Sequence, residues 1–291
     1  MLIWPDCIAC TVKMGLQVAR EALKDDDMVM RLMKDVLRLE SLTMPATNLT
    51  SPEIILDIWS LITDAAGDRN PLRAAKTDQN QAILQLYPQI KESVLASSDP
   101  FSEAVRFAII GNAIDALVDG LEKGAAGMLA EFSGQSVDAE QVGILRSRVK
   151  GADRILYFTD NCGEIVFDRI LIEVMKEVLG SSVTAIVRTH PAMNDASLED
   201  ARFVGLDSAA EVIPNGIEKP LAGTMLRAVS PRILSLIEQA DILILKGGGN
   251  YDTMTEEPTI VGKTSYLFQA KCYPYSALHH VPVGSLVIVN N

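Results

Sequence analysis

Acidic and amide side chains stand directly behind a short apolar run in the second half of this sequence. Asp160 and Asn161 follow the run Ile155–Thr159, and Gly163 and Glu164 come next. Where a chain leaves a sheet its side chains no longer alternate between faces, so adjacent carboxylate and amide oxygens can reach one cation. Gly163 permits a tight turn, and Glu164 could orient a water molecule or a substrate hydroxyl. The alternative is that Asp160 or Asn161 only caps the helix that follows.

Asp195 is the expected third oxygen ligand. It follows Asn194 in the segment behind a second apolar run, Val183–Val187, and N-capping of the next helix is again the alternative. Two carboxylates and an amide suit one divalent metal ion, Mg²⁺, Mn²⁺, Co²⁺ or Ni²⁺, with positions left for water and a phosphate oxygen. Such an ion would polarise a phosphoryl group. Arg188, at the exit of the same run, and Asn194 are predicted to contact the substrate.

The string Lys246-Gly-Gly-Gly-Asn250 is the most unusual in the chain. Three glycines cost backbone entropy, which is explained if the backbone must approach a ligand closely. Lys246 would supply a point charge to phosphate, and Gly247, Gly248, Gly249 and Asn250 are predicted to bind substrate. The string is neither a P-loop nor a dinucleotide-binding fingerprint, because its Lys precedes the glycines. The alternative is a flexible turn with a solvated Lys.

The elements that must position these groups alternate between strand and helix from about residue 151. Helices are expected at Glu164–Leu179, Ser197–Val204 and Pro231–Gln239, and strands at Ile155–Thr159, Val183–Val187, Glu211–Pro214, Ile242–Leu245, Tyr266–Ala270 and Ser285–Val289. Continuous apolar strands of this kind predict a mainly parallel sheet in a three-layer α/β/α fold. Ligands bind at the carboxyl ends of such strands, so the polar groups named above are expected to converge.

The first half of the chain is predicted to be all helical. Apolar residues recur at helical spacing in Thr11–Leu23, Met28–Leu42, Pro52–Ala66, Asn70–Ala96 and Phe101–Leu121. We expect a helical domain over residues 1–150 and an α/β metal-binding catalytic domain over 151–291. Asn112 and Asp115 share one face of an apolar helix. They either point into the cleft between the two domains, or form a buried polar pair, or mark the end of the helix.

Composition limits the partners and the compartment. The chain has 291 residues and a formal net charge of −12, and it has no basic stripe, so nucleic acid is an unexpected partner. No apolar run is long enough to span a membrane, and the first residues lack the pattern of a signal peptide. Four cysteines suit reduced thiols in a cytoplasm. The oligomeric state stays open.

The cysteines have no assigned role. Cys7 and Cys10 form a C-x-x-C ahead of a helix, and no second pair completes a zinc signature. A redox dithiol, half of a metal site and two buried small residues all remain open for this pair. Cys162 and Cys272 stand alone at two strand exits, where they could line the same pocket.

Taken together, these strings resemble the metal-dependent damage-control phosphatase family, also known as domain-of-unknown-function family eighty-nine. The similarity rests on TDNCGEIVFDRILIE, NDASLEDARFVGLD, KGGGNYDTMTE and FQAKC, in this order. The N-terminal PDCIACTVKMGLQVAR and the string GNAID resemble its short prokaryotic branch, which carries an N-terminal C-x-x-C. The resemblance spans nearly the whole chain and implies a helical N-terminal region on a three-layer α/β/α domain.

The resemblance also implies roles for single residues. It implies one divalent metal held by Asp160, Asn161 and Asp195, and it places Glu164 and Lys246 at the conserved Glu and Lys of two family motifs. The chain departs from the family pattern at Cys162, where a small residue is more common, and at Gly248, where a polar residue is common. The string Arg188-Thr-His190 stands where a glycine-rich string is expected.

The expected reaction is hydrolysis of a phosphomonoester of a small metabolite. Family members are described as acting on phosphorylated sugars or damaged phosphometabolites, including phosphopantetheine-like compounds. We expect Asp160, Glu164 and Lys246 to be catalytic, with either a water or a carboxylate as nucleophile. One alternative is an S-adenosylmethionine-dependent carboxyl methyltransferase, an activity assigned to a eukaryotic branch of the family. The other is a non-catalytic protein that binds a metal or a phosphometabolite.

Overall fold

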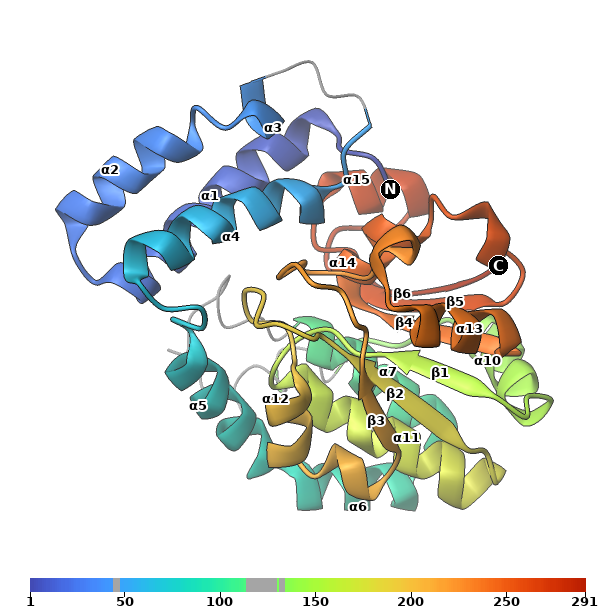
Figure 1. Ribbon diagram of the computed structural model, residues 1–291. Coiled ribbons are helices and arrows are strands. Elements are labelled where there is room, and N and C mark those ends of the chain that lie inside the picture. The colour runs from blue at the N-terminus through green and yellow to red at the C-terminus, as the bar shows by residue number, and fades with distance from the viewer. Residues whose placement is uncertain (44–47, 114–129, 131–133) are drawn as a thin grey trace.

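The computed structural model describes residues 1–43, 48–113, 130 and 134–291 of the chain. Within these residues six strands form one sheet that lies between two layers of helices, which confirms the predicted three-layer α/β/α fold (Figure 1). The strands are β1 Ile155–Phe158, β2 Val183–Val187, β3 Glu211–Pro214, β4 Ile242–Lys246, β5 Thr264–Gln269 and β6 Leu286–Asn290.

The order of the strands creates a binding crevice at one point of the sheet edge. The order is β3-β2-β1-β4-β5-β6, all neighbours are parallel up to β5, and β6 is antiparallel to β5. The chain builds outward from β1 in one direction and from β4 in the other. Loops that leave β1 and β4 therefore diverge, and a parallel sheet binds ligands in the gap between them.

Alternate side chains of each strand enter two separate cores. On β1, Tyr157 packs in the cluster formed with α7, α10 and α11, whereas Phe158 packs in the cluster formed with α13, α14 and α15. Both faces of the sheet are therefore covered by helices, which explains why the strands are continuously apolar. The helices concerned are α7 Pro100–Ala113, α10 Ala139–Lys150, α11 Glu164–Leu179, α13 Pro231–Gln239, α14 Gly247–Met254 and α15 Tyr273–His279.

The first helices of the chain form a separate group beyond the sheet edge (Figure 1, blue). Their core includes Trp59 and Ile58 and also Met193 and Ala222, which belong to loops of the α/β half. The boundary near residue 150 stays a prediction, although α7 and α10 precede it and share a core with α11. The remaining helices are α1 Pro5–Leu23, α2 Asp26–Val36, α3 Glu40–Thr43, α4 Ser51–Ala66, α5 Arg73–Leu84, α6 Tyr87–Ala96, α12 Leu198–Phe203 and the short 3₁₀ turns Leu206–Ser208, Leu226–Ala228 and Pro258–Ile260.

Several predicted helix boundaries in the first half are wrong. The predicted helix Asn70–Ala96 is two helices, because Pro88 has no N–H to continue a helix and sits instead in the first turn of α6. The predicted helix Met28–Leu42 ends at Val36. The first helix begins at Pro5, where a proline in the first turn is well tolerated.

The glycine string is a helix terminus and not a loop. Lys246 ends β4, and α14 begins at Gly247 without an intervening turn. Glycines disfavour helix, but the residues that follow are buried against β4 and β5, and this packing outweighs local propensity. Asp115 and Leu121 of the predicted fifth helix lie outside the described residues. None of the described helices combines the length and hydropathy that crossing a bilayer requires.

Candidate functional site

A cavity of about 350 Å³ lies beyond the carboxyl ends of the strands and under α1 and α4. Six of the predicted site residues line it: Asp160, Asn161, Asn194, Asp195, Gly248 and Gly249. The other five, Glu164, Arg188, Lys246, Gly247 and Asn250, do not line the cavity, and all five are buried. The site therefore has an inner layer of oxygen groups and an outer layer that holds them.

Backbone hydrogen bonds join the two acidic loops. Asn161 and Asp195 form an isolated antiparallel bridge. The N–H of Ala196 donates to the carbonyl of Asp160 at 2.7 Å, and the N–H of Cys162 donates to the carbonyl of Asn194 at 2.9 Å. Residues 32 to 36 positions apart in the chain are thus paired through their backbones, as the converging strand ends predicted.

Arg188 is the group that spans the two carboxylates. Its Nε donates to Asp195 Oδ2 at 2.5 Å, and its Nη2 donates to Asp160 Oδ1 at 3.3 Å. Its Nη1 donates to Thr224 Oγ1 and to Asn250 Oδ1, both at 3.0 Å. The side chain is 2 % exposed, so Arg188 orients the acids from behind. This geometry gives it a positioning task different from the predicted contact with substrate.

Burial disfavours the ionised forms of Asp160 and Asp195 in this arrangement. Burial raises the pKa of Asp160 well above its usual range, and the carboxylates of Asp195 and Glu164 push it further in the same direction. Burial also raises the pKa of Asp195, although the Arg188 guanidinium opposes the shift. A bound cation would relieve both costs, because it stabilises the ionised form of each acid.

The amide of Asn161 is oriented to complete an oxygen donor set. Its Nδ2 donates to Asp160 Oδ2 at 2.8 Å and to Glu164 Oε2 at 3.0 Å. With both amide hydrogens used, the amide oxygen is the part of Asn161 that remains to serve a ligand. Hard cations bind oxygen groups of this kind, so Asp160, Asn161 and Asp195 fit one divalent metal ion.

Lys246 lies behind the cavity wall and does not face the cavity. Its Nζ donates to Glu164 Oε1 and Asp168 Oδ1, both at 2.7 Å, and to the carbonyl of Ala108 at 2.8 Å. Three acceptors saturate the ammonium, and the side chain is fully buried. The sequence predicted that Lys246 faces a phosphate across a glycine turn, but its ammonium group points away from the cavity. The last residue of β4 points into the α7 and α11 layer.

Glu164 and Asp168 share this ammonium, with opposite results. Burial pushes the pKa of Glu164 upward, but Lys246 and Asn112 outweigh it, so the pKa is lowered and the carboxylate is ionised. Burial dominates at Asp168 and raises its pKa to about 6. An ionised Glu164 can hold the amides of Asn112 and Asn161, both 3.0 Å away, and through them the position of Asp160.

Each of the three glycines is required because a neighbouring group packs closely against it. A Cβ on Gly247 would lie 1.8 Å from Asp160 Oδ2, and the residue has φ +73°. A Cβ on Gly249 would lie 2.4 Å from the carbonyl of Ala222, and one on Gly248 would lie 2.7 Å from Tyr275 Oη. Glycine at these positions lets the first turn of α14 approach Asp160, whereas the predicted close approach of this backbone to a ligand stays a prediction.

The tertiary structure brings several groups to the site that the sequence analysis did not assign to it. Lys271, which comes shortly after β5, lines the cavity. Asp252 and Tyr275 also line it. Asn112 of α7 donates to Asp160 Oδ2 at 3.3 Å and accepts from the N–H of Gln269 at 3.1 Å. The signals were the position of Lys271 at a strand exit and a polar Asn112 in an apolar helix.

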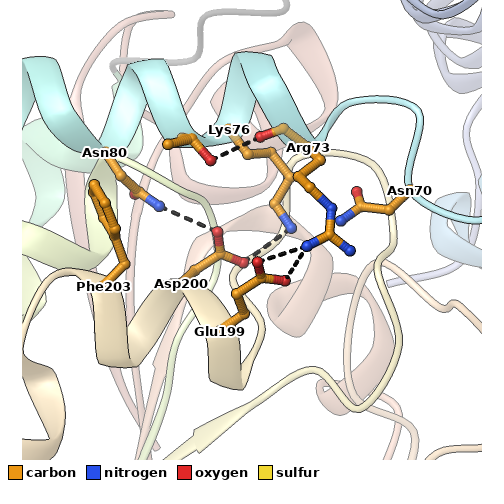
Figure 2. Close-up of a pocket in the computed structure, with 8 residues that line it drawn as sticks. Asn70, Arg73, Lys76, Asn80, Glu199, Asp200 and Phe203 are labelled. Atoms are coloured by element: carbon orange, nitrogen blue, oxygen red, sulfur yellow. Dashed lines mark hydrogen bonds and ion pairs between the residues drawn. The ribbon is translucent and has the colours of Figure 1, made fainter.

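A second, small cavity of about 40 Å³ lies between α5 and α12 (Figure 2). Asn80 accepts from the N–H of Gly163 at 2.7 Å and donates to Asp200 Oδ1 at 3.2 Å. Lys76 pairs with Asp200 Oδ2 at 3.0 Å, and Arg73 contacts Glu199 at 2.6 Å nearer the surface. This network fixes the loop that carries Asp160 and Asn161 without entering the main cavity.

The cysteines divide between the two regions. Cys7, Cys10 and Cys272 line the main cavity, and all four cysteines are free thiols. Cys162 is fully buried, and its side chain hydrogen-bonds Asp200 and Asn80. The expectation that Cys162 and Cys272 share a pocket is therefore wrong, because the side chain after Asn161 turns toward α5.

Among the described residues, no cluster of three or more His, Cys, Asp or Glu side chains is placed to hold a metal ion. The predicted donor set differs from such a cluster, because it has two carboxylates and one amide. Its fit to a cation rests on the raised pKa values of the acids and on the oriented amide of Asn161.

Comparisons with known proteins give a consistent result over the whole chain. A family model described as the damage-control phosphatase ARMT1-like domain matches residues 3–287. A damage-control phosphatase of Archaeoglobus fulgidus is 30 % identical over 299 residues, 99 % of this chain and 98 % of that protein. A damage-control phosphatase of Pyrococcus horikoshii is 29 % identical over 300 residues, 100 % of this chain and 99 % of that protein.

A solved structure supports the same relationship. The crystal structure of a DUF89 family protein from Pyrococcus horikoshii matches with a TM-score of 0.85 at 29 % sequence identity. The match covers 100 % of this chain and 99 % of that one. A likeness of this extent includes the N-terminal helices as well as the sheet.

Proposed function

The chain belongs to the damage-control phosphatase ARMT1-like family, and from this premise we propose that it hydrolyses phosphomonoesters of small metabolites with one divalent cation. The observation that carries the proposal is the meeting of two buried carboxylates and an oriented amide oxygen on one wall of a cavity. The two relatives named damage-control phosphatases agree with it.

Asp160, Asn161 and Asp195 would hold the cation. When bound, a divalent ion polarises a phosphoryl group and neutralises charge that develops on its oxygens. The protein's own task is to keep the donors in position. Arg188 holds the two carboxylates from behind, and Asn161 is fixed through its amide hydrogens.

Two features of the wall suit the phosphate itself. Lys271 contributes an ammonium group to the cavity, in the role that the sequence assigned to Lys246. Gly248 and Gly249 line the cavity in the first turn of α14, where backbone N–H groups have no partner within the helix. A helix N-terminus of this kind attracts anions, so the glycine string would bind phosphate through its backbone.

The cavity volume suits a small substrate. A space of about 350 Å³ lies at the lower end of the range for small-molecule sites. The names of the relatives point to damaged metabolites, and the family resemblance adds phosphorylated sugars. Both classes carry the phosphomonoester that the proposed chemistry requires.

The test is hydrolysis of p-nitrophenyl phosphate and a panel of phosphometabolites with Mg²⁺, Mn²⁺, Co²⁺ or Ni²⁺, each with and without a chelator. We expect turnover that depends on the ion and is lost with the chelator. Absence of turnover with every ion contradicts the proposal. Tight, metal-independent binding of S-adenosylmethionine would favour the methyltransferase instead, and metabolite binding without turnover would favour a non-catalytic protein.

A further inference from the structure

The cavity has a second wall whose chemistry differs from the acidic edge. On α1, Cys7, Cys10, Thr11 and Met14 all line the cavity. Their spacing is i, i+3, i+4, i+7, which places them on one face of a helix. The C-x-x-C is therefore one turn of a helical stripe that faces the cavity.

Sulfur-bearing side chains continue this wall beyond α1. Met193 and Cys272 line the same cavity, and Ile55 and Pro52 of α4 complete its apolar part. Met193 has φ +51°, a left-handed conformation that a residue other than glycine rarely adopts. It directly precedes the Asn194-Asp195 pair, so the strained position joins the apolar wall to the acidic edge.

Polar groups on this wall already have partners inside the protein. The hydroxyl of Thr11 donates to the carbonyl of Ile8 at 3.1 Å, and the hydroxyl of Tyr275 donates to Asp252 Oδ1 at 2.9 Å. Asp6 and Lys13 are exposed at the rim. A hydroxyl-rich ligand would lose hydrogen bonds to water on this wall and regain few, which disfavours its binding.

We propose that this sulfur-bearing wall, made of Cys7, Cys10, Met14, Met193 and Cys272 with Ile55, binds the apolar body of the substrate. The substrate class is then an alkyl or aryl phosphomonoester, with its phosphate at Asp160 and Asp195, in preference to a sugar phosphate. Unbranched, polarisable sulfur side chains adapt to different apolar shapes, so several such esters should fit. The inference rests on the proposed phosphatase function.

The first test compares kcat/KM for hexyl phosphate and glucose 6-phosphate with Mn²⁺. We expect at least a tenfold preference for hexyl phosphate. Met14→Gln should reduce this preference about tenfold, because it introduces an unpaired amide into the wall at nearly the same volume. Met30→Gln is the matched control, since Met30 is 59 % exposed on α2, and it should leave the preference unchanged.

The second test needs neither a variant nor catalysis. Cys10 is exposed toward solvent on the cavity-facing stripe, so its alkylation by iodoacetamide can be followed by mass spectrometry. With Mn²⁺ present, hexylphosphonate should slow alkylation of Cys10 at least fivefold, and glucose 6-phosphate at the same concentration should not.

The outcomes separate this inference from the phosphatase proposal. Hydrolysis of both esters without preference for hexyl phosphate, or equal protection of Cys10 by the sugar phosphate, overturns the inference and leaves the phosphatase proposal standing. Protection of Cys10 by hexylphosphonate alone, with no ester hydrolysed by any ion, supports the wall and overturns the phosphatase proposal. If hexylphosphonate does not protect Cys10 and the enzyme shows no preference for hexyl phosphate, the inference is overturned.

Discussion

At the scale of single residues, three neighbouring side chains donate hydrogen bonds to the carboxylate of Asp160. Its Oδ2 accepts from Asn112 and Asn161, and its Oδ1 faces Arg188. An asparagine at this position would keep most of this shape without the charge. Its NH₂ group, however, would face Asn112, Asn161 or Arg188, which are themselves hydrogen-bond donors. Asp160 should therefore be needed for its charge and not for the fold.

Asp160→Asn should lower kcat/KM for p-nitrophenyl phosphate by about a hundredfold or more, which is the usual scale for losing one charge-stabilising group. The circular dichroism spectrum should remain that of the wild type. Asp78→Asn, at an exposed position of α5, is the control. Turnover of the Asp160 variant at the wild-type rate would remove this residue from the mechanism.

Asp252 gives a prediction for stability against pH. Burial raises its pKa to about 6 from a usual 3.8. Because the folded state holds this proton to a higher pH than the unfolded chain, the contribution to stability is present below about pH 4 and is lost as the pH rises through about 6.

Asp252→Asn removes this dependence. Relative to the wild type, its free energy of unfolding should rise between pH 4 and pH 7 by up to about 3 kcal/mol. Urea denaturation at several pH values measures the difference. A difference that does not change with pH would mean that Asp252 has no raised pKa.

At the scale of elements, the start of α14 shows a helix placed against its own propensity. The glycines weaken the helix, yet they allow its first turn to approach Asp160 and Tyr275. α5 has a matching role on the other side, because Asn80 holds the N–H of Gly163. The acidic loop is thus held between two helices that are far apart in the sequence.

Gly247→Ala should destabilise the protein and displace Asp160. The added Cβ would lie 1.8 Å from Asp160 Oδ2, at a φ that disfavours alanine. We expect a loss of at least about 1 kcal/mol in urea denaturation, with weaker Mn²⁺ binding by calorimetry. Gly143→Ala on α10, where a Cβ meets nothing within 4 Å, should instead stabilise by about 0.5–1 kcal/mol. Equal effects at the two positions would contradict the packing argument.

At the scale of the whole molecule, the N-terminal helices close the cavity over the sheet edge. Trp59 of α4 is fully buried, and its Nε1 donates to the carbonyl of Pro191 at 3.0 Å. Pro191 precedes the Asn194-Asp195 pair by a few residues. A hydrogen bond therefore links the N-terminal helices to the loop that carries Asn194 and Asp195.

Trp59→Phe breaks this link and leaves an aromatic side chain in the core. It should cost about 2 kcal/mol of stability, from a lost hydrogen bond and a smaller side chain, and it should raise KM for an aryl phosphate. Ile62→Val, at a buried position of the same helix, should cost about 1 kcal/mol and leave KM unchanged. The same KM in both variants would show that the link does not affect the site.

The sequence by itself determined the fold class, the strands of the sheet and the edge at which the site lies. Parallel strands read as apolar runs, and their carboxyl ends must meet at one edge, so Asp160, Asn161 and Asp195 could be brought together without coordinates. Only the tertiary structure decided that Lys246 points away from the cavity, that Arg188 holds the acids and that α1 turns its thiols inward. Those directions depend on contacts between segments that are distant in the chain, such as Lys246 with Ala108 and Arg188 with Asn250, and local periodicity carries no information about such contacts.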